Sequence, residues 1–398
     1  MKKALINATL FIGNGDVLDN AGVVIDHGTI AKVLKAEDQP PPDLECIDLS
    51  GKMLFPGFID CHVHLCLDGS ADPMTNAIND SPAKMTLKAA RHARDTLMAG
   101  VTTVRDMGAF AGIDTALRDA VAAGQMPGPR ILAAGRVICM TGGHGWQLGG
   151  READGPDEVR RAAREQIKAG CDHVKLMATG GVLTPGVDPG STQLTKEELR
   201  AGIEEAHKAG RLTSAHAQGR DGILNSLWAG IDSIEHGIFL DQQAMELMLE
   251  RGVPLVPTLA PGLNVLAKGV EAGVPSFAVE KNKWVVPQHL QMLEMAHDGG
   301  VCIASGTDAG TPFNRHGANL AEIVNLAQNG LSPSEALCAA TGIAAQVLGL
   351  EQEIGLIKEG MAADLVAVSG NPLEQIDLLL SAQAIHMVMQ GGRIVRQD

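Results

Sequence analysis

The sequence predicts an α/β protein: a (β/α)8 TIM-like barrel with a small composite β-sandwich domain built from both termini. Helical stretches in the middle of the chain end at a glycine that is followed at once by a short apolar run. Polar residues recur near the ends of these runs, and both ends of the chain alternate apolar and polar residues between turn signals. We therefore assign residues 56–359 to the barrel and residues 1–55 and 360–398 to the β domain.

The two ends of the chain have the composition of short strands and hairpins. The segments ALINATLFI and GVVIDHG flank the turn residues Gly13-Asn14-Gly15-Asp16, and alternation between such turns is typical of hairpins. The segments ADLVAVSGNPL and IHMVMQGGRIVRQD repeat this pattern near the C-terminus. No small-residue cleavage site follows the initial lysines, so we interpret the start as a strand and not as a signal peptide.

The middle of the chain contains eight apolar runs that alternate with helical stretches. A glycine ends a helix by adopting the left-handed conformation just past its last turn, as expected at Ala99-Gly100-Val101. Thr195 with Glu198 is a capping box that begins one of the helices. Short apolar runs are typical of buried parallel strands. The eight predicted strands lie in FPGFIDCHVHL, VTTVRD, PRILAAGRVI, CDHVKLM, RLTSAHA, IDSIEHG, VPLVPTL and VCIASGTD.

Strand counting alone also allows an open doubly wound sheet, and the polar residues favour the barrel. Lys175, His216, His236 and Asp308 all follow their strands at similar positions. The carboxyl ends of barrel strands converge on one mouth, where active sites are built. In an open sheet the same residues would be spread along an edge.

Composition excludes several classes of function. The net charge is −15, which disfavours binding to nucleic acid or to an anionic membrane. Aromatic residues are 3% and tyrosine is absent, so neither a base-stacking surface nor phenol chemistry is expected. The seven cysteines form no CxxC pair, and the longest uncharged stretch, 252–267, contains three prolines and is shorter than the ~20 residues of a spanning helix. We expect a cytoplasmic enzyme with a small-molecule substrate.

Six of the residues near strand ends have the chemistry of a metal site. His62 and His64 are two apart on one strand, so both imidazoles face the same side. For this pair alone, a structural role is an equal alternative. A buried Lys175 needs a partner, a lowered pKa or covalent modification, and an ion pair with Asp106 is one solution. With His216, His236 and Asp308 the set suits Zn, Mn, Fe or Co.

The chain resembles the amidohydrolase superfamily over nearly its whole length. The motifs that carry the resemblance are FPGFIDCHVHL, VKLMATGG, TSAHAQG, SIEHG, SGTDAG and, near the end, LGLEQEIGLIKEGMAADLVAV. TGGHG at 141–145 and the short spacing from His216 to His236 are most similar to the imidazolonepropionase-related, prolidase-like branch. That branch includes enzymes that cleave dipeptides or other N-acyl amino acids.

The resemblance implies a binuclear metal-dependent hydrolase that cleaves a C–N amide bond by attack of a metal-bridging hydroxide. Two divalent ions are implied, with Zn expected, and a CO2-derived carbamate on Lys175 bridges them. The implied ligands are His62, His64 and Asp308 for one ion, His216 and His236 for the second, and Lys175 for both. Asp308 is also the implied proton acceptor, which passes the proton to the leaving nitrogen.

Three further residues are candidates for binding the substrate. His144 in TGGHG resembles a substrate-facing position, and Arg220 and His316 follow the fifth and eighth strands, where they could bind a substrate carboxylate. Some dipeptidase-like relatives carry tyrosine where this chain has Gln218, which puts transfer of their specificity in question. By analogy with this architecture we expect a homo-oligomer.

Three alternative functions remain open at this point. A cyclic-amide hydrolase or a deaminase could use the same scaffold, although deaminase relatives usually lack the bridging lysine, so Lys175 argues against a deaminase. A non-catalytic metal-binding barrel is the alternative from another class. The intact set of six residues speaks against it, because a scaffold has no use for Asp308 as a proton shuttle.

Overall fold

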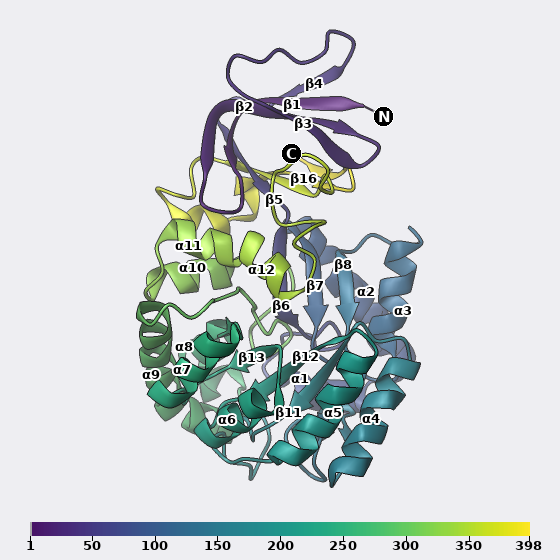
Figure 1. Ribbon diagram of the computed structural model, residues 1–398, viewed down its shortest axis with the longest axis vertical. Coiled ribbons are helices and arrows are strands. Elements are labelled where there is room, and N and C mark those ends of the chain that lie inside the picture. Colours follow the sequence, from purple (N-terminus) through teal and green to yellow (C-terminus); the bar gives the residue numbers. More distant parts are fainter. Residues whose placement is uncertain (1) are drawn as a thin grey trace.

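The computed structural model describes residues 2–398, whose strands form three sheets. The largest is an eight-stranded sheet to which both ends of the chain contribute, and the two termini lie at this end of the molecule (Figure 1). Its order is β17-β16-β15-β5-β1-β2-β3, and β4 pairs with β1. The strands are β1 Lys3–Phe11, β2 Val17–Asp26, β3 Thr29–Leu34, β4 Glu45–Asp48, β5 Lys52–Pro56, β15 Leu365–Ser369, β16 Ile385–Gln390 and β17 Arg393–Gln397.

The two ends of the chain meet where β5 pairs antiparallel with β15, with Leu54 opposite Ala367. Apolar residues of β1, β2, β5, β15 and β16 pack into one buried cluster, which includes Leu10, Leu54 and Met387. This burial follows from the period-two alternation of the strands, which gives one face of the sheet to the cluster.

Two further sheets are purely parallel and contain the strands that hold the candidate site. One has the order β6-β7-β8, the other β10-β9-β11-β12-β13-β14. The strands are β6 Phe58–Val63, β7 Val101–Asp106, β8 Arg130–Ala133, β9 Ile138–Cys139, β10 Arg151–Glu152, β11 His173–Met177, β12 Leu212–Ala217, β13 Ser233–His236 and β14 Leu255–Val256. The predicted strand PRILAAGRVI is thus two short strands, β8 and β9, which belong to different sheets.

The last predicted strand, VCIASGTD, is not a regular strand. Residues 301–309 make only isolated parallel bridges, Ile303 with Leu255 and Ala309 with Val63. Single hydrogen bonds nevertheless link the segment to both neighbours: Ala304 N donates to Leu255 O, and Cys61 N donates to Ser305 O. The positive φ of 56° at Asp308 bends the backbone away from a strand.

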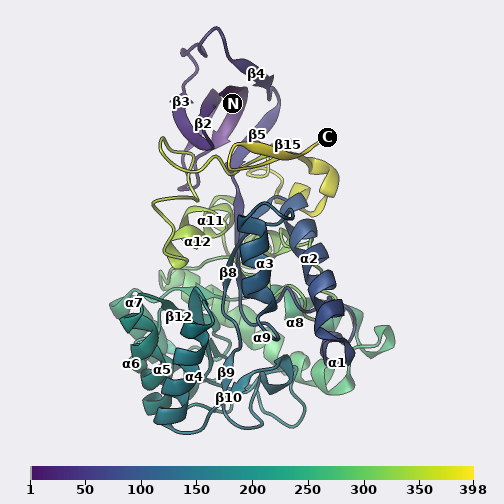
Figure 2. The same ribbon diagram turned by 90° about the vertical axis from the view of Figure 1, so that its right-hand side faces the viewer.

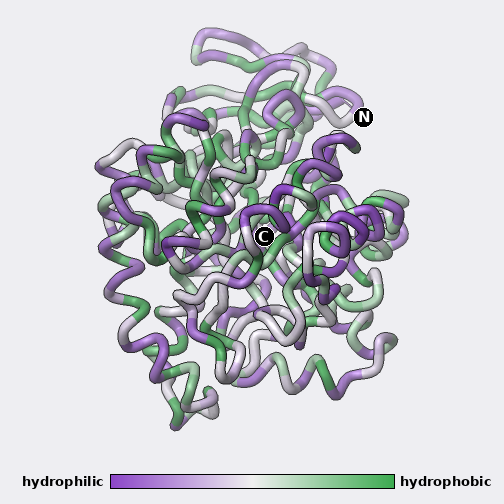
Figure 3. Tube along the Cα trace, turned by 60° about the horizontal axis from the view of Figure 1, so that its bottom comes forward, coloured by the Kyte–Doolittle hydropathy of each residue, from purple (hydrophilic) through white to green (hydrophobic). Residues whose placement is uncertain are grey.

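Helices lie outside the parallel strands and separate them along the chain (Figures 1 and 2). They are α1 Pro73–Asn79, α2 Pro82–Met98, α3 Ile113–Ala122, α4 Pro156–Lys168, α5 Lys196–Lys208, α6 Arg220–Ala229, α7 Gln242–Arg251, α8 Leu259–Lys268, α9 Ser276–Asp298, α10 Ala321–Gln328, α11 Pro333–Ala339 and α12 Gly342–Val347. The predicted capping box of Thr195 and Glu198 begins α5. Hydrophilic and hydrophobic stretches alternate along the tube, as expected for helices with one buried face (Figure 3).

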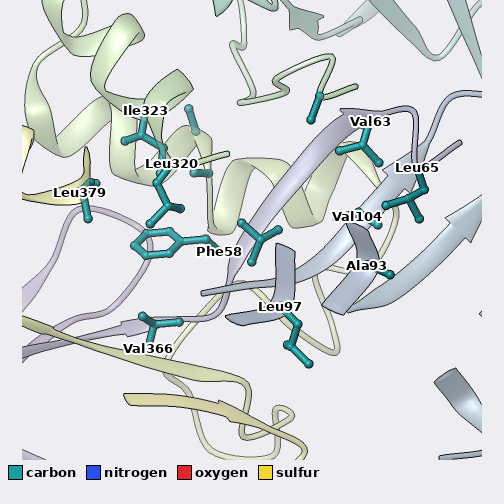
Figure 4. Packing of buried hydrophobic residues seen from close by; sticks show 14 of the residues in the cluster. Phe58, Val63, Leu65, Ala93, Leu97, Val104, Leu320, Ile323, Val366 and Leu379 are labelled. Carbon is teal, nitrogen blue, oxygen red and sulfur yellow. The ribbon is translucent and has the colours of Figure 1, made fainter. Parts of the chain in front are cut away.

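A buried apolar cluster joins the parallel strands to the terminal sheet. Phe58 of β6, Val366 of β15 and Leu97 of α2 all belong to it (Figure 4). Because both sheets contribute side chains to this cluster, the terminal sheet supports the non-site end of β6. Among residues 2–398, no helix combines the length and apolar character that crossing a bilayer requires.

Candidate metal and substrate site

All six predicted metal-site residues line one cavity at the carboxyl ends of the parallel strands. His62 is in β6 and His64 follows it; Lys175 lies in β11 and His216 in β12. His236 ends β13, and Asp308 lies in the irregular segment after α9. Parallel strands point their carboxyl ends the same way, so residues far apart in sequence meet here.

His62, His64 and Asp308 form the tightest group. Oδ1 of Asp308 lies 3.5 Å from His62 Nε2 and 3.4 Å from His64 Nε2. One ligand atom from each residue lies within 4.8 Å of the others, which is close enough for all three to bind one ion. The Nδ1–H of His64 donates to the Gly108 carbonyl at 3.2 Å, leaving Nε2 as the lone-pair nitrogen.

Glu235 fixes the ring of His62 from the buried side. The Nδ1–H of His62 donates to Glu235 Oε2 at 2.8 Å, so Nε2 has the lone pair that faces Asp308. Oε1 of Glu235 accepts from Arg105 at 2.8 Å and from Ser233 at 2.7 Å. The carboxylate is therefore fully paired although its side chain is 0% exposed.

His216 and His236 form a second pair beside the first group. Their ring centroids are 4.6 Å apart, and that of His236 lies 5.1 Å from His62. His216 Nε2–H donates to Gly180 O at 2.9 Å, and His236 Nδ1 bonds the Thr258 hydroxyl at 2.6 Å. His236 has a φ of 71°, a strained conformation that, like that of Asp308, is concentrated at functional sites.

Lys175 is buried without a hydrogen-bond partner. Its Nζ and Oδ1 of Asp308 are among the buried polar atoms that no described group bonds. The alternative ion pair with Asp106 does not form, because that carboxylate accepts from the backbone N–H groups of Leu65 and Gly108. Burial lowers the pKa of Lys175 to about 8 and raises that of Asp308 to about 8. Such an uncompensated pair is costly unless another charged group completes the site.

Burial also keeps the imidazoles neutral. It lowers the pKa of His64 to about 4 and the pKa values of His62, His216 and His236 well below the ordinary range. Neutral imidazole is the form that binds metal. With the unpartnered Asp308 and Lys175, this donor set fits divalent ions of the zinc type.

The three predicted substrate-binding residues have different positions. His144 lines the cavity; its Nδ1 lies 2.7 Å from the Thr184 hydroxyl and its ring centroid 4.3 Å from that of His216. Arg220 does not line the cavity, because at the start of α6 its guanidinium pairs with Asp221 and Asp241 at the surface.

His316 is also outside the cavity lining, contrary to the expected contact with substrate. Its Nε2–H lies 3.2 Å from His64 O and 3.1 Å from Leu67 O, and its ring stacks on His92. It therefore supports the backbone that carries His64 and does not face the substrate.

Glu235 and His289 belong to the site but were not predicted from the sequence. Glu235 is a charged residue inside the apolar run SIEHG, which is a sign that a buried partner exists. His289 of α9 lines the cavity with Asn282 and Val285. The spacing of these three residues places them on one helix face, but the sequence contains no signal that this face borders the site.

A loop between β11 and α5 covers one side of the cavity. Val182 and Leu183 of this loop line the cavity, and Thr184 bonds His144. Lys281 of α9 donates to three loop carbonyls: Gly181 at 3.2 Å, Thr184 at 2.8 Å and Val187 at 2.6 Å. The ammonium group of Lys281 thus holds the loop against α9 by three hydrogen bonds.

Comparisons with known proteins give consistent matches over most or all of the chain. The model of the Amidohydrolase family matches residues 53–395. Ochratoxinase of Aspergillus niger is 32% identical over 99% of this chain and 87% of its own length. A crystal structure of a Xaa-Pro dipeptidase with bound methionine is 33% identical with a TM-score of 0.92, and that of a prolidase with N-methylphosphonate-L-proline is 31% identical with a TM-score of 0.93. Each covers 100% of both chains.

Proposed function

Since the chain belongs to the amidohydrolase family and is a hydrolase of C–N amide bonds, we propose that it is a binuclear metal enzyme that cleaves dipeptides or other N-acyl amino acids. The observation that carries the proposal is the cavity itself. Four buried, neutral imidazoles surround a lysine and a carboxylate that have unpartnered buried atoms. The relatives named as dipeptidase, prolidase and ochratoxinase support this class of reaction.

The residues divide into two ligand groups. His62, His64 and Asp308 would hold one ion, and His216 and His236 the other, with Zn as the proposed metal. Two divalent ions, when bound there, supply Lewis-acid chemistry: they make water acidic enough to ionise near neutral pH and they polarise a carbonyl.

Lys175 would join the two groups as a carbamate. Its neutral amine attacks CO2, a C–N bond forms, and one proton leaves, so that a cation becomes an anionic carboxylate ligand. The unpartnered Nζ is consistent with this modification, because an unmodified ammonium there finds no hydrogen-bond acceptor within the described part of the chain, residues 2–398.

Asp308 would move the proton of the reaction. Its Oδ1 accepts no hydrogen bond from residues 2–398, so it is available to take a proton from the attacking water and to give it to the leaving nitrogen.

We assign His144 to the carboxylate of the substrate. Among residues 2–398, the only Lys or Arg side chain that lines the cavity is Lys175, so no fixed cation is left for this role. The bond of His144 Nδ1 to Thr184 leaves Nε2 for a substrate hydrogen bond.

For the fold we propose a closed (β/α)8 barrel over residues 56–359, with the composite β domain formed by 1–55 and 360–398. Support comes from the hydrogen bonds of residues 301–309, which link β14 on one side to β6 on the other. The match of the family model to residues 53–395 is compatible with this division.

The proposal is tested by metal content and by a substrate panel. Elemental analysis after metal-supplemented purification should give close to two divalent ions per chain; repeated values of one or none would refute the binuclear site. The loaded protein should hydrolyse members of a panel of dipeptides, including prolyl ones, and N-acyl amino acids.

Variants of Lys175 test the carbamate. Lys175→Ala should lose the bridge and most activity, while Lys175→Glu should retain metal through its own carboxylate. Short-chain carboxylic acids added to Lys175→Ala should restore part of the activity. Wild-type turnover with two bound ions in Lys175→Ala would show that Lys175 is no bridge.

A further inference from the structure

The cavity contains two polar side chains that have no place in the proposed metal site. Gln218, just after β12, is 6% exposed, and His289 of α9 is 5% exposed. Oε1 of Gln218 and Nε2 of His289 are buried and have no hydrogen-bond partner among residues 2–398. Leaving one such atom unpaired costs about 1–3 kcal/mol, so both are candidates to bind a ligand.

Both atoms accept hydrogen bonds. Oε1 of a glutamine amide is an acceptor. The backbone carbonyls of Pro257 and His236 lie beside the ring of His289 and favour a proton on the nitrogen that faces them. Because Nε2 has no partner among residues 2–398, we place the proton of the neutral ring on Nδ1, and Nε2 then has only a lone pair. The ligand that satisfies this pair must therefore bring N–H or O–H groups.

Apart from His144 and the proposed metal ligands, the other polar side chains of the wall, Thr258, Asn282 and Thr311, already make hydrogen bonds within the protein. Leu67, Met177, Ile238, Val265 and Val285 are among the apolar residues that line the cavity. A substrate that enters this cavity therefore buries an apolar side chain and must place its donors near the two acceptors.

The two unpaired acceptors restrict the class of substrate that the cavity can bind. An N-alkanoyl amino acid, whose acyl group carries neither an amino nor a hydroxyl group, has only acceptors apart from its scissile N–H, and its carboxylate cannot donate. A dipeptide adds a free α-amino group on the acyl half, which has up to three N–H donors. We propose that Gln218 and His289 recognise this α-amino group, so that the enzyme prefers dipeptides with an apolar first residue. The inference rests on the proposed amide hydrolysis.

The test compares three substrates that differ only in the acyl group and share the same leaving amino acid. Alanine, proline and phenylalanine are each tried as the leaving amino acid. The acyl groups are L-leucyl, its α-hydroxy analogue and its des-amino analogue, 4-methylpentanoyl. For the wild type, kcat/KM should be about a hundredfold higher for the leucyl than for the des-amino substrate. Gln218→Leu and His289→Phe should each reduce this ratio about tenfold, whereas Gln218→Glu, which keeps an acceptor, should retain it.

The control is Gln242→Leu, which makes the same change at an exposed position on α7 and should keep the wild-type ratio. A wild-type ratio near one, or ratios unchanged in both cavity variants, would overturn the inference. If the α-hydroxy substrate has the same kcat/KM as the leucyl substrate, the site accepts any hydrogen-bond donor, and the assignment to the amino group is wrong.

Calorimetric binding of L-leucine and of 4-methylpentanoate provides a readout besides activity. L-leucine should bind at least about tenfold more tightly to the wild type, and this preference should disappear in Gln218→Leu. If no substrate is hydrolysed with two ions bound, the proposed function fails, but this comparison still decides the inference. Equal binding of the two compounds would refute it.

Discussion

Replacing Glu235 by glutamine should weaken metal binding although Glu235 is not itself a proposed ligand. Its two oxygens are both engaged, Oε2 with His62 and Oε1 with Arg105 and Ser233. Glutamine has the same shape but one oxygen and one NH2 group. Whichever way the amide turns, one of these contacts becomes a conflict.

The two orientations have different consequences. With the NH2 group toward His62, the amide donates to Nδ1, the ring proton moves to Nε2, and the nitrogen that faces Asp308 loses its lone pair. With the NH2 group toward Arg105, a donor faces a buried guanidinium that is 2% exposed. Removing such second-layer partners typically costs about 10–100-fold in metal affinity. Breaking the ion pair of Glu235 with Arg105 costs about 3 kcal/mol of stability, the lower end for a buried pair, because a hydrogen bond can remain.

Two measurements separate these effects. Competition with a chromophoric chelator gives the metal affinity, and urea unfolding of the metal-free protein gives the stability. The double variant Arg105→Met with Glu235→Leu should recover much of the stability, because it removes both buried charges, but none of the metal affinity. Glu204→Gln, which changes a partly exposed acid on α5 that pairs with Arg200, should change neither. Wild-type metal affinity in Glu235→Gln would refute the role of Glu235 in orienting His62.

Three further substitutions test other contacts in the structure. Lys281→Met should release the loop from α9, so that KM rises by a factor about tenfold larger than the factor by which kcat falls. Proteolysis of residues 181–187 should also become faster. The control is Lys283→Met, which makes the same change at an exposed position. His144→Ala should raise KM about 10–100-fold for free-acid substrates and hardly affect amidated ones, so equal losses on both would contradict the carboxylate contact. Hydrogen bonds from Arg164 and Lys208 lower the pKa of Glu205 to about 2. The ionised Glu205 therefore stabilises the fold above pH 4.5. Glu205→Gln should therefore lower Tm by about 1–2 °C at pH 7, and the difference should shrink as pH falls from 4.5 towards 2; a constant difference would contradict the assignment.

Much of the fold could be predicted because its signals are local. A glycine after a helix, followed by an apolar run, located five of the regular parallel strands, which are β7, β11, β12, β13 and β14. The capping box at Thr195 could be predicted for the same reason, since its two partners are three residues apart. The eighth run failed as a regular strand because the bend at Asp308 depends on packing against β6 and not on its own composition.

The sequence by itself determined the membership of the six-residue group at the strand ends. A strand period of two places His62 and His64 on one face, and the parallel arrangement brings the ends of distant strands together. These are properties of the backbone, so the spacing of residues along the chain is enough to infer them.

Only the tertiary structure decided which polar residues border the cavity and which support it. Arg220 is held at the surface by the acids around it, and His316 is packed behind His64. Glu235 and His289 entered the site through contacts between elements far apart in sequence. Whether a side chain binds a neighbour, faces a cavity or faces solvent depends on those contacts, and no local pattern of residues encodes them.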